Sequence, residues 1–283
     1  MTVQTANYGL YTFQLVPIER HRQTTLFDKV LEPEDLIARK NQLFGELLSS
    51  FPTLRSNRHE LVQKTTFRSP EWVIIKLASK HSLTRQQPNF QSETLDDWPH
   101  INLIICNDPE IQAIAISRNK RAFSDPSVVA QLLKENLLQP IEKMGLMLHI
   151  EPQFNKNHFW DLVEKYSGKI TSVRFECVTP NMSRISHMVS EDLKDLAKNT
   201  NAQLTEVELK SHPESSLELN KDDKTVNDLL SYTSLGGGNI SLKARGVRRT
   251  IRTATEVRET IIDELQFDTS NEAGLEMLKA LLR

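Results

Sequence analysis

The densest group of side chains suited to one chemistry lies in residues 235–258. This stretch holds six basic residues and one acidic residue, whereas 201–234 holds three Lys and seven acids, and 259–283 holds two basic residues and six acids. A guanidinium group is a rigid fork of donors that binds phosphate oxygens through paired hydrogen bonds. The stretch therefore favours contacts with a nucleic-acid backbone. Its basic residues are Lys243, Arg245, Arg248, Arg249, Arg252 and Arg258.

Two short strands are expected to position these side chains. Three consecutive glycines, at 236–238, precede the first strand and allow a positive φ or a close approach to a ligand. Alternation along the strand 239–244 places Ile240 and Leu242 on one face and Lys243 on the other. Gly246 can form the corner before a second strand at 247–253. We predict a basic hairpin over 239–253 that presents Lys243, Arg245, Arg248, Arg249 and Arg252.

Other interpretations of this hairpin stay open. Basic residues commonly protect an edge strand from aggregation, and acidic flanks can neutralise a basic segment. The same surface can also dock an acidic partner or a second subunit. A second basic group, at Arg118, Lys120 and Arg121, is predicted to extend the nucleic-acid-binding surface.

Residues with catalytic potential form no complete motif. None of the eight histidines belongs to a metal-binding pattern, and no C-x-x-C pair exists. Glu206, Glu208 and Lys210 give E-x-K on a predicted strand, but no upstream Asp lies on an obvious partner strand. We therefore predict no catalytic residues, no metal and no cofactor, and favour a binding protein over an enzyme. A metal-dependent nuclease is the weaker alternative.

The two cysteines, Cys106 and Cys177, lie inside apolar runs. A free cysteine in such a run behaves as a small core hydrophobe in a reducing compartment. We predict that both are buried and free.

Length and composition fit a folded protein of ordinary size. The chain has 283 residues, 35 Lys+Arg against 37 Asp+Glu and a hydrophobic fraction of 38%, which argues against wholesale disorder. The common glycine-rich nucleotide cradles are absent. No apolar run approaches the roughly 20 residues of a membrane span, and no secretory leader opens the chain. We expect a cytoplasmic protein without membrane insertion.

The order of elements predicts an α+β fold with a mixed, largely antiparallel sheet and helices packed on one side. Hairpins come first and helix–strand units follow. Pro140 is expected to kink or break the helix that begins at Pro126. The segment 81–100 has no apolar period and is predicted to be a long loop. A boundary near residue 100 is expected to separate an N-terminal α+β region, 1–100, from the main region, 101–283, unless the two form one continuous domain.

Five stretches carry a resemblance in their order along the chain. They are YGLYTFQL, AIAISRNKRAFSDPSVVAQLL, LMLHIEP, FWDLVEKYSGKITSVRFECVTPN and GGNISLKARG. This order resembles the RexA-like phage-exclusion proteins of bacteria and prophages, with ISLKA the most similar part. The three glycines and the denser arginine run depart from that family.

The resemblance implies a cytoplasmic, homodimeric α+β protein that binds nucleic acid during phage infection and acts with a partner protein from a neighbouring gene. Combined with the basic hairpin, it predicts an anti-phage defence protein that binds nucleic acid without sequence preference, DNA rather than RNA. The alternative is a non-enzymatic interaction subunit of a defence complex.

Overall fold

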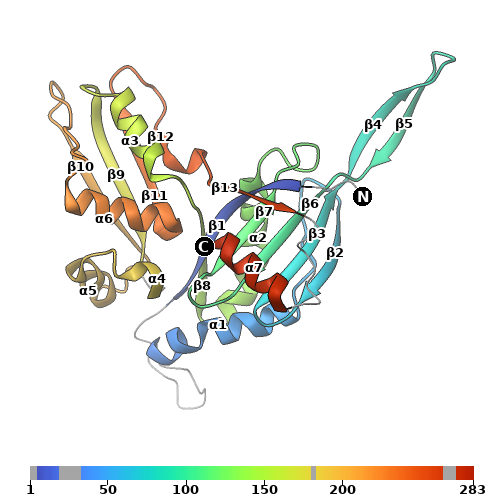
Figure 1. Ribbon diagram of the computed structural model, residues 1–283, viewed down its shortest axis with the longest axis horizontal. Coiled ribbons are helices and arrows are strands. Elements are labelled where there is room, and N and C mark those ends of the chain that lie inside the picture. The colour runs from blue at the N-terminus through green and yellow to red at the C-terminus, as the bar shows by residue number, and fades with distance from the viewer. Residues whose placement is uncertain (1–4, 19–32, 180–182, 264–271) are drawn as a thin grey trace.

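The computed structural model describes residues 5–18, 33–179, 183–263 and 272–283. Figure 1 shows a large sheet with helices on its faces, a smaller sheet beside it and a long hairpin that projects from the large sheet. All strand pairings among these residues are antiparallel. The predicted α+β class is confirmed.

The large sheet is organised around one long strand, β1 (Thr5–Pro17). The first part of β1 pairs with β13 and β7, and its second part pairs with β8. Apolar side chains are buried on both faces of β1, as its aromatic and β-branched sequence predicts. The sheet order is β13 (Glu259–Asp263), β1, β7 (Ala113–Ser117), β6 (His100–Cys106), β3 (Trp72–Ser79), β2 (Leu61–Arg68), with β8 (Leu146–Pro152) also on β1.

Helices cover both faces of this sheet, whereas the sequence analysis expected them on one side. The apolar stripes of α1 (Pro33–Ser49) and α2 (Pro126–Lys143) pack on one face, around Phe13 and Phe44. Helix α7 (Glu272–Leu282) covers the other face through Leu278 and Leu282. Of the kink or break expected at Pro140, the break is wrong, because α2 continues to Lys143. Ile141 is 1% exposed and anchors that last turn in the core.

The smaller sheet has the order β10 (Leu204–Lys210), β9 (Ile170–Val178), β11 (Gly238–Ala244), β12 (Ile251–Arg252). Its core gathers Phe159, Phe175 and Tyr232. The boundary expected near residue 100 falls within the large sheet, where β3 and β6 are neighbours. The change of sheet comes after β8. The remaining helices of the described residues are α3 (Lys156–Lys165), α4 (Ser183–Ser186), α5 (Glu191–Asn199), α6 (Lys224–Tyr232), the π-helical turn η1 (Thr233–Gly237) and the 3-10 turn η2 (Thr253–Thr255).

The three glycines join the two sheets. The hydroxyl of Thr12 on β1 donates to the carbonyl oxygen of Leu235 at 2.7 Å. Gly236 has φ +81°, and a Cβ there would lie 2.4 Å from Cβ of Thr12. A Cβ on Gly238 would lie 1.8 Å from the carbonyl oxygen of Glu176 on β9. The positive φ that the sequence allows is found at Gly236 and Gly238, and the close approach that these buried glycines permit is to other parts of the chain.

The segment predicted to be a long loop is instead a two-stranded arm. Among the described residues, strands β4 (His81–Gln86) and β5 (Ser92–Asp97) pair only with each other. Residues 82–96 are all exposed. Neither face is buried, so the sequence carries no apolar alternation from which the strands could be predicted. We call residues 81–97 the arm.

Candidate nucleic-acid interface

The predicted basic hairpin exists, with a shorter second strand. Ser241 pairs with Arg252 and Leu242 with Ile251, while residues 247–250 form an irregular turn. Ile240 and Leu242 face the core, as predicted from the alternation. Adjacent charged residues at Arg248 and Arg249 leave no apolar side chain to anchor that part of the predicted strand. We call the exposed cations of this hairpin the basic turn: Lys243, Arg245, Arg248, Arg249 and Arg252.

The basic turn carries uncompensated positive charge. Within the described ranges no carboxylate pairs with any of its five cations; Arg245 donates instead to the carbonyl oxygen of Ser215 at 2.6 Å. Several carboxylates of the acidic flanks have other partners. Glu208 pairs with Lys210 at 2.9 Å and Glu259 with Arg118, and Glu256, the one acidic residue within 235–258, pairs with His158. The structure therefore gives no support to neutralisation of the basic turn by its flanks.

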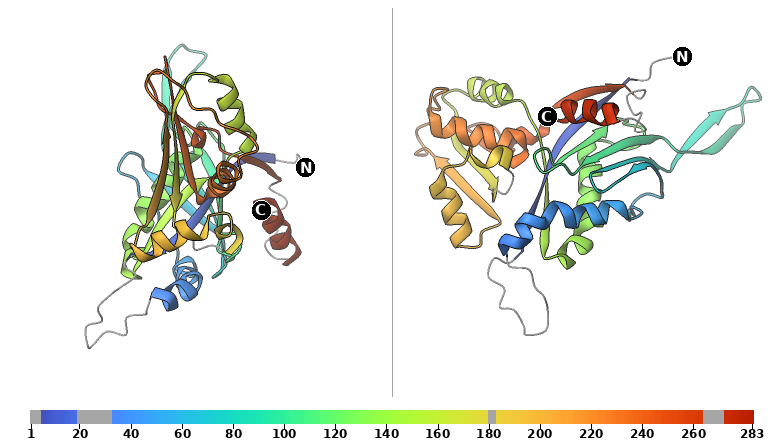
Figure 2. Two further views of the ribbon diagram at one scale, coloured as in Figure 1. Left: turned by 90° about the vertical axis from the view of Figure 1, so that its left-hand side faces the viewer. Right: turned by 60° about the horizontal axis from the view of Figure 1, so that its bottom comes forward.

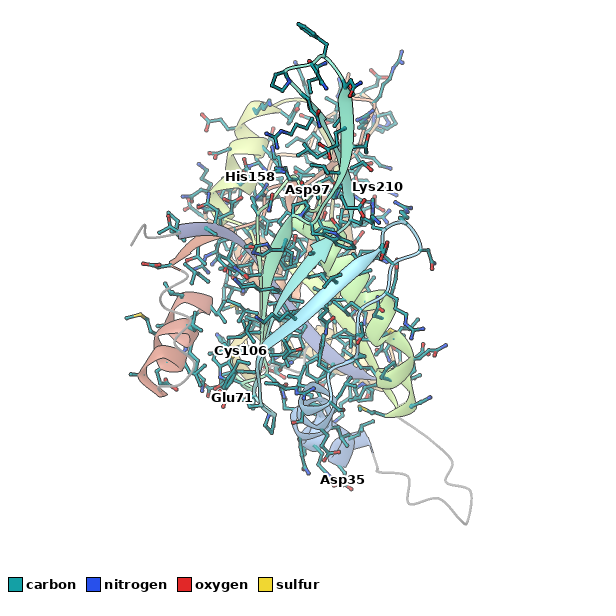
Figure 3. All side chains as sticks on the ribbon, turned by 90° about the vertical axis from the view of Figure 1, so that its right-hand side faces the viewer. Asp35, Glu71, Asp97, Cys106, His158 and Lys210 are labelled. Carbon is teal, nitrogen blue, oxygen red and sulfur yellow. The ribbon has the colours of Figure 1, made fainter. Side chains whose placement is uncertain are left out.

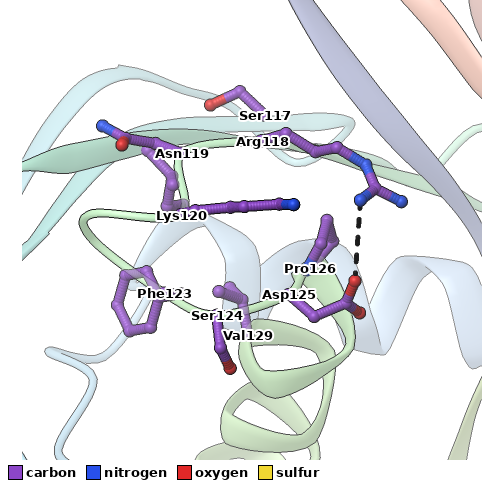
Figure 4. A pocket seen from close by; sticks show the side chains of 10 residues that line it. Ser117, Arg118, Asn119, Lys120, Phe123, Ser124, Asp125, Pro126 and Val129 are labelled. Carbon is purple, nitrogen blue, oxygen red and sulfur yellow. Dashed lines mark ion pairs between the residues drawn. The ribbon is translucent and has the colours of Figure 1, made fainter.

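The second predicted group, Arg118, Lys120 and Arg121, lies in the loop that follows β7 of the large sheet and is largely neutralised. We call it the basic corner. Arg118 forms ion pairs with Glu259 and, at 3.7 Å, with Asp125. Arg121 is paired with a carboxylate at the base of the arm. Lys120 is exposed, and no carboxylate of the described residues pairs with it. Figure 4 shows Lys120 across a small pocket at the start of α2, opposite the Arg118–Asp125 pair.

The basic turn and the basic corner lie on the same side of the molecule, the upper side of Figure 1, although the basic turn and the arm stand at opposite ends of its longest axis. Both Figure 1 and the left view of Figure 2 place the turn between β11 and β12 at the upper end of the small sheet, and the arm projects on that same side. The corner adjoins the base of the arm. The eight predicted residues therefore form two separate surfaces with one general orientation, and the basic turn has the greater free charge.

The E-x-K residues are engaged in ion pairs. Arg174 on β9 lies 3.2 Å from Glu206 and 3.6 Å from Glu208. The hydroxyl of Ser172 also donates to Glu208, at 2.9 Å, and together with Lys210 it lowers the pKa of that carboxyl group. Across the described ranges there is no group of three or more His, Cys, Asp or Glu side chains that could hold a metal ion.

Both cysteines are buried and free, which confirms the prediction. Burial raises the pKa of the Cys106 thiol and of the Cys177 thiol to about 12 in each case. A thiol with such a pKa is not a nucleophile near neutral pH. Figure 3 places Cys106 near Glu71, at the end of the large sheet away from the arm.

The residue that the sequence analysis missed is Phe90, at the tip of the arm. Its side chain is 97% exposed, the most exposed large apolar side chain described. The available signal was the run Gln87-Pro88-Asn89-Phe90, because proline at the second position favours a tight turn. That turn lay in a segment without apolar period, so it was not recognised as the tip of a hairpin.

Comparisons with known proteins found no matching protein-family model, curated protein or solved structure. In the part of the chain that the structure describes, no helix is long and apolar enough to cross a membrane.

Proposed function

We propose that this protein binds nucleic acid without sequence preference, DNA rather than RNA, through the basic turn. The observation that carries the proposal is a set of five exposed cations in one hairpin with no carboxylate partner among the described residues. Unpaired guanidinium groups at the surface lose little on binding phosphate, because no existing ion pair has to break.

Phage defence is the biological setting that we propose, and it rests on the resemblance to RexA-like phage-exclusion proteins. The same resemblance supports a cytoplasmic homodimer that acts with a partner protein. The rival function is docking of an acidic protein on the basic turn, which uses the same charges.

The test compares two charge-matched double variants in fluorescence anisotropy with labelled duplex DNA. Arg248→Ala with Arg249→Ala removes two cations of the basic turn that make no hydrogen bond or ion pair within the described structure. Arg39→Ala with Lys143→Ala removes two cations from α1, which lies on the lower side of the molecule in Figure 1, and from the last turn of α2. Both variants change the net charge equally.

We expect the basic-turn variant to weaken binding at least tenfold at low salt and the control to weaken it no more than about twofold. Equal losses in both variants would show that binding depends on overall charge and would contradict the proposal. Glu206→Ala serves as the nuclease control: we expect it to leave binding unchanged, and Mg²⁺-dependent cleavage abolished by Glu206→Ala would favour the nuclease alternative.

A further inference from the structure

We infer that the arm is a wedge for duplex DNA, in which Phe90 enters between base pairs while the basic turn contacts phosphates. This inference rests on the proposed function and specifies its ligand as a deformable duplex. Apolar side chains at the end of a protruding element can insert between base steps and kink DNA by about 20–90°.

The tip of the arm has a defined conformation. The amide of Phe90 donates to the carbonyl oxygen of Gln87 at 2.9 Å, and the amide of Gln87 donates to the carbonyl oxygen of Gln91 at 2.9 Å. The side-chain carbonyl of Asn89 accepts from the amide of Gln91 at 3.1 Å. Pro88 fixes φ inside this turn. The turn therefore fixes the backbone that carries the aromatic ring at the far end of the arm.

Phe90 adopts a backbone conformation that its side chain disfavours. Its φ is +63°, in the left-handed region where glycine or asparagine is the common residue. The ring is 97% exposed and so gains almost no burial in return. A bulky apolar residue kept in this conformation and in water points to a ligand outside the chain.

The surroundings of Phe90 suit a nucleic acid. Four amide side chains flank the ring, and side-chain amides bond to the polar edges of base pairs in the minor groove. No carboxylate lies between residues 86 and 92, and the nearest one, Glu93, accepts a hydrogen bond from the side-chain amide of Gln87 at 3.0 Å. The acidic residues at the base of the arm are compensated, because Asp96 lies 2.8 Å from Lys80 and Asp97 lies 2.6 Å from Arg121. The four amides are Gln86, Gln87, Asn89 and Gln91.

The same surface is poorly suited to a stable protein interface. Such interfaces bury about 800 Å² on each partner around an apolar centre. The tip offers one aromatic ring and one proline among amides. The arm's other large apolar side chains, Leu83 and Leu95, lie opposite each other within the arm. The arm therefore has no large apolar centre around which an interface could form. A wedge needs only the ring.

The test uses short duplexes with 2-aminopurine at several positions, whose fluorescence rises when the base is unstacked, and a donor–acceptor pair at the duplex ends to report bending. The variant is Phe90→Gly, which removes the ring and suits a positive φ, so the turn is retained. Phe90→Leu keeps an apolar side chain that is shorter than the ring. Circular dichroism and the thermal midpoint establish that each variant is folded.

We expect the wild-type protein to raise both signals at saturation. Phe90→Gly should weaken binding several-fold and abolish both signals even at saturation, and Phe90→Leu should keep them in part. Arg248→Ala with Arg249→Ala should weaken binding while the signals at saturation stay.

Two outcomes overturn the wedge alone. Salt-sensitive duplex binding without either signal would reject it and leave the proposed function standing. A change of oligomeric state in Phe90→Gly, measured by sedimentation velocity, would make the arm a contact between copies of the chain. Absence of duplex binding by the wild-type protein would reject the proposed function and the wedge together.

Discussion

The guanidinium group of Arg121 lies 2.6 Å from the carboxylate of Asp97, which joins the basic corner to the base of the arm. The side chain of Arg121 is 68% exposed, so the pair is solvated and contributes at most about 1 kcal/mol to stability. The larger effect of this ion pair is on the surface charge, because it reduces the positive charge beside the arm that is free to bind phosphate.

Asp97→Asn should therefore release Arg121 for phosphate. We expect duplex DNA affinity at low salt to rise about two- to threefold, with the free energy of unfolding changed by less than about 1 kcal/mol. Asp195→Asn, an exposed position on α5, is the matched control for the change in net charge. Equal gains in both variants, or a loss of affinity in Asp97→Asn, would show that the corner does not face the nucleic acid.

Gly238→Ala should be severely destabilising. The added Cβ would meet the carbonyl oxygen of Glu176, a backbone atom of β9 that cannot move without loss of the pairing with β11. We expect the free energy of unfolding, measured with urea, to fall by about 3 kcal/mol or more. Gly246→Ala is the control: its φ is also positive, at +82°, but nothing lies within 4 Å of the added atom. It should cost only about 1 kcal/mol, and similar costs for the two variants would contradict the packing role.

The two thiols should be inert in the native protein. Because burial raises their pKa values to about 12, a thiol reagent at pH 8 should label neither Cys106 nor Cys177 before unfolding. Cys106→Ala and Cys177→Ala should each lower stability by on the order of 1 kcal/mol and leave nucleic-acid binding intact. Rapid native labelling, or loss of binding by a folded variant, would contradict their role as core residues.

Stability should fall between about pH 6.5 and pH 4 through His149 on β8. Burial, and next the charge of Lys134, lower the pKa of His149 to about 4. In that interval the unfolded chain binds a proton that the folded chain does not, so lowering the pH favours unfolding, by at most about 3 kcal/mol. His149→Gln removes the contribution of His149 protonation to the free energy of unfolding. The difference in that free energy between wild type and the variant should therefore narrow as the pH falls. A difference in the free energy of unfolding that stays constant from pH 7 to pH 4 would contradict this role of His149.

The parts of the fold that could be predicted are those in which sequence pattern and burial agree. The apolar run that forms β1 and the alternation of Ile240 and Leu242 in β11 predict correctly which side chains of these strands are buried. The arm could not be predicted this way, since its strands bury neither face. The passage of α2 through Pro140 also depends on a tertiary contact, the burial of Ile141, that local rules do not contain.

The candidate site was predictable only in part for a related reason. The cations of the basic turn are close together in the sequence, so their cluster was visible there. The neutralisation of the basic corner was not, because Asp97, Asp125 and Glu259 come from separate segments and meet Arg118 or Arg121 only in the folded chain.

The most direct test of the central claim is the salt dependence of wild-type binding, measured by anisotropy with duplex DNA, single-stranded DNA and RNA. Three to five phosphate contacts by the basic turn predict a slope of log affinity against log salt of about −3 to −4.5 for duplex DNA. Between about 50 and 200 mM salt, affinity should then fall by roughly two orders of magnitude or more. No binding to any of the three at 50 mM salt, or binding that does not change with salt, would contradict the account.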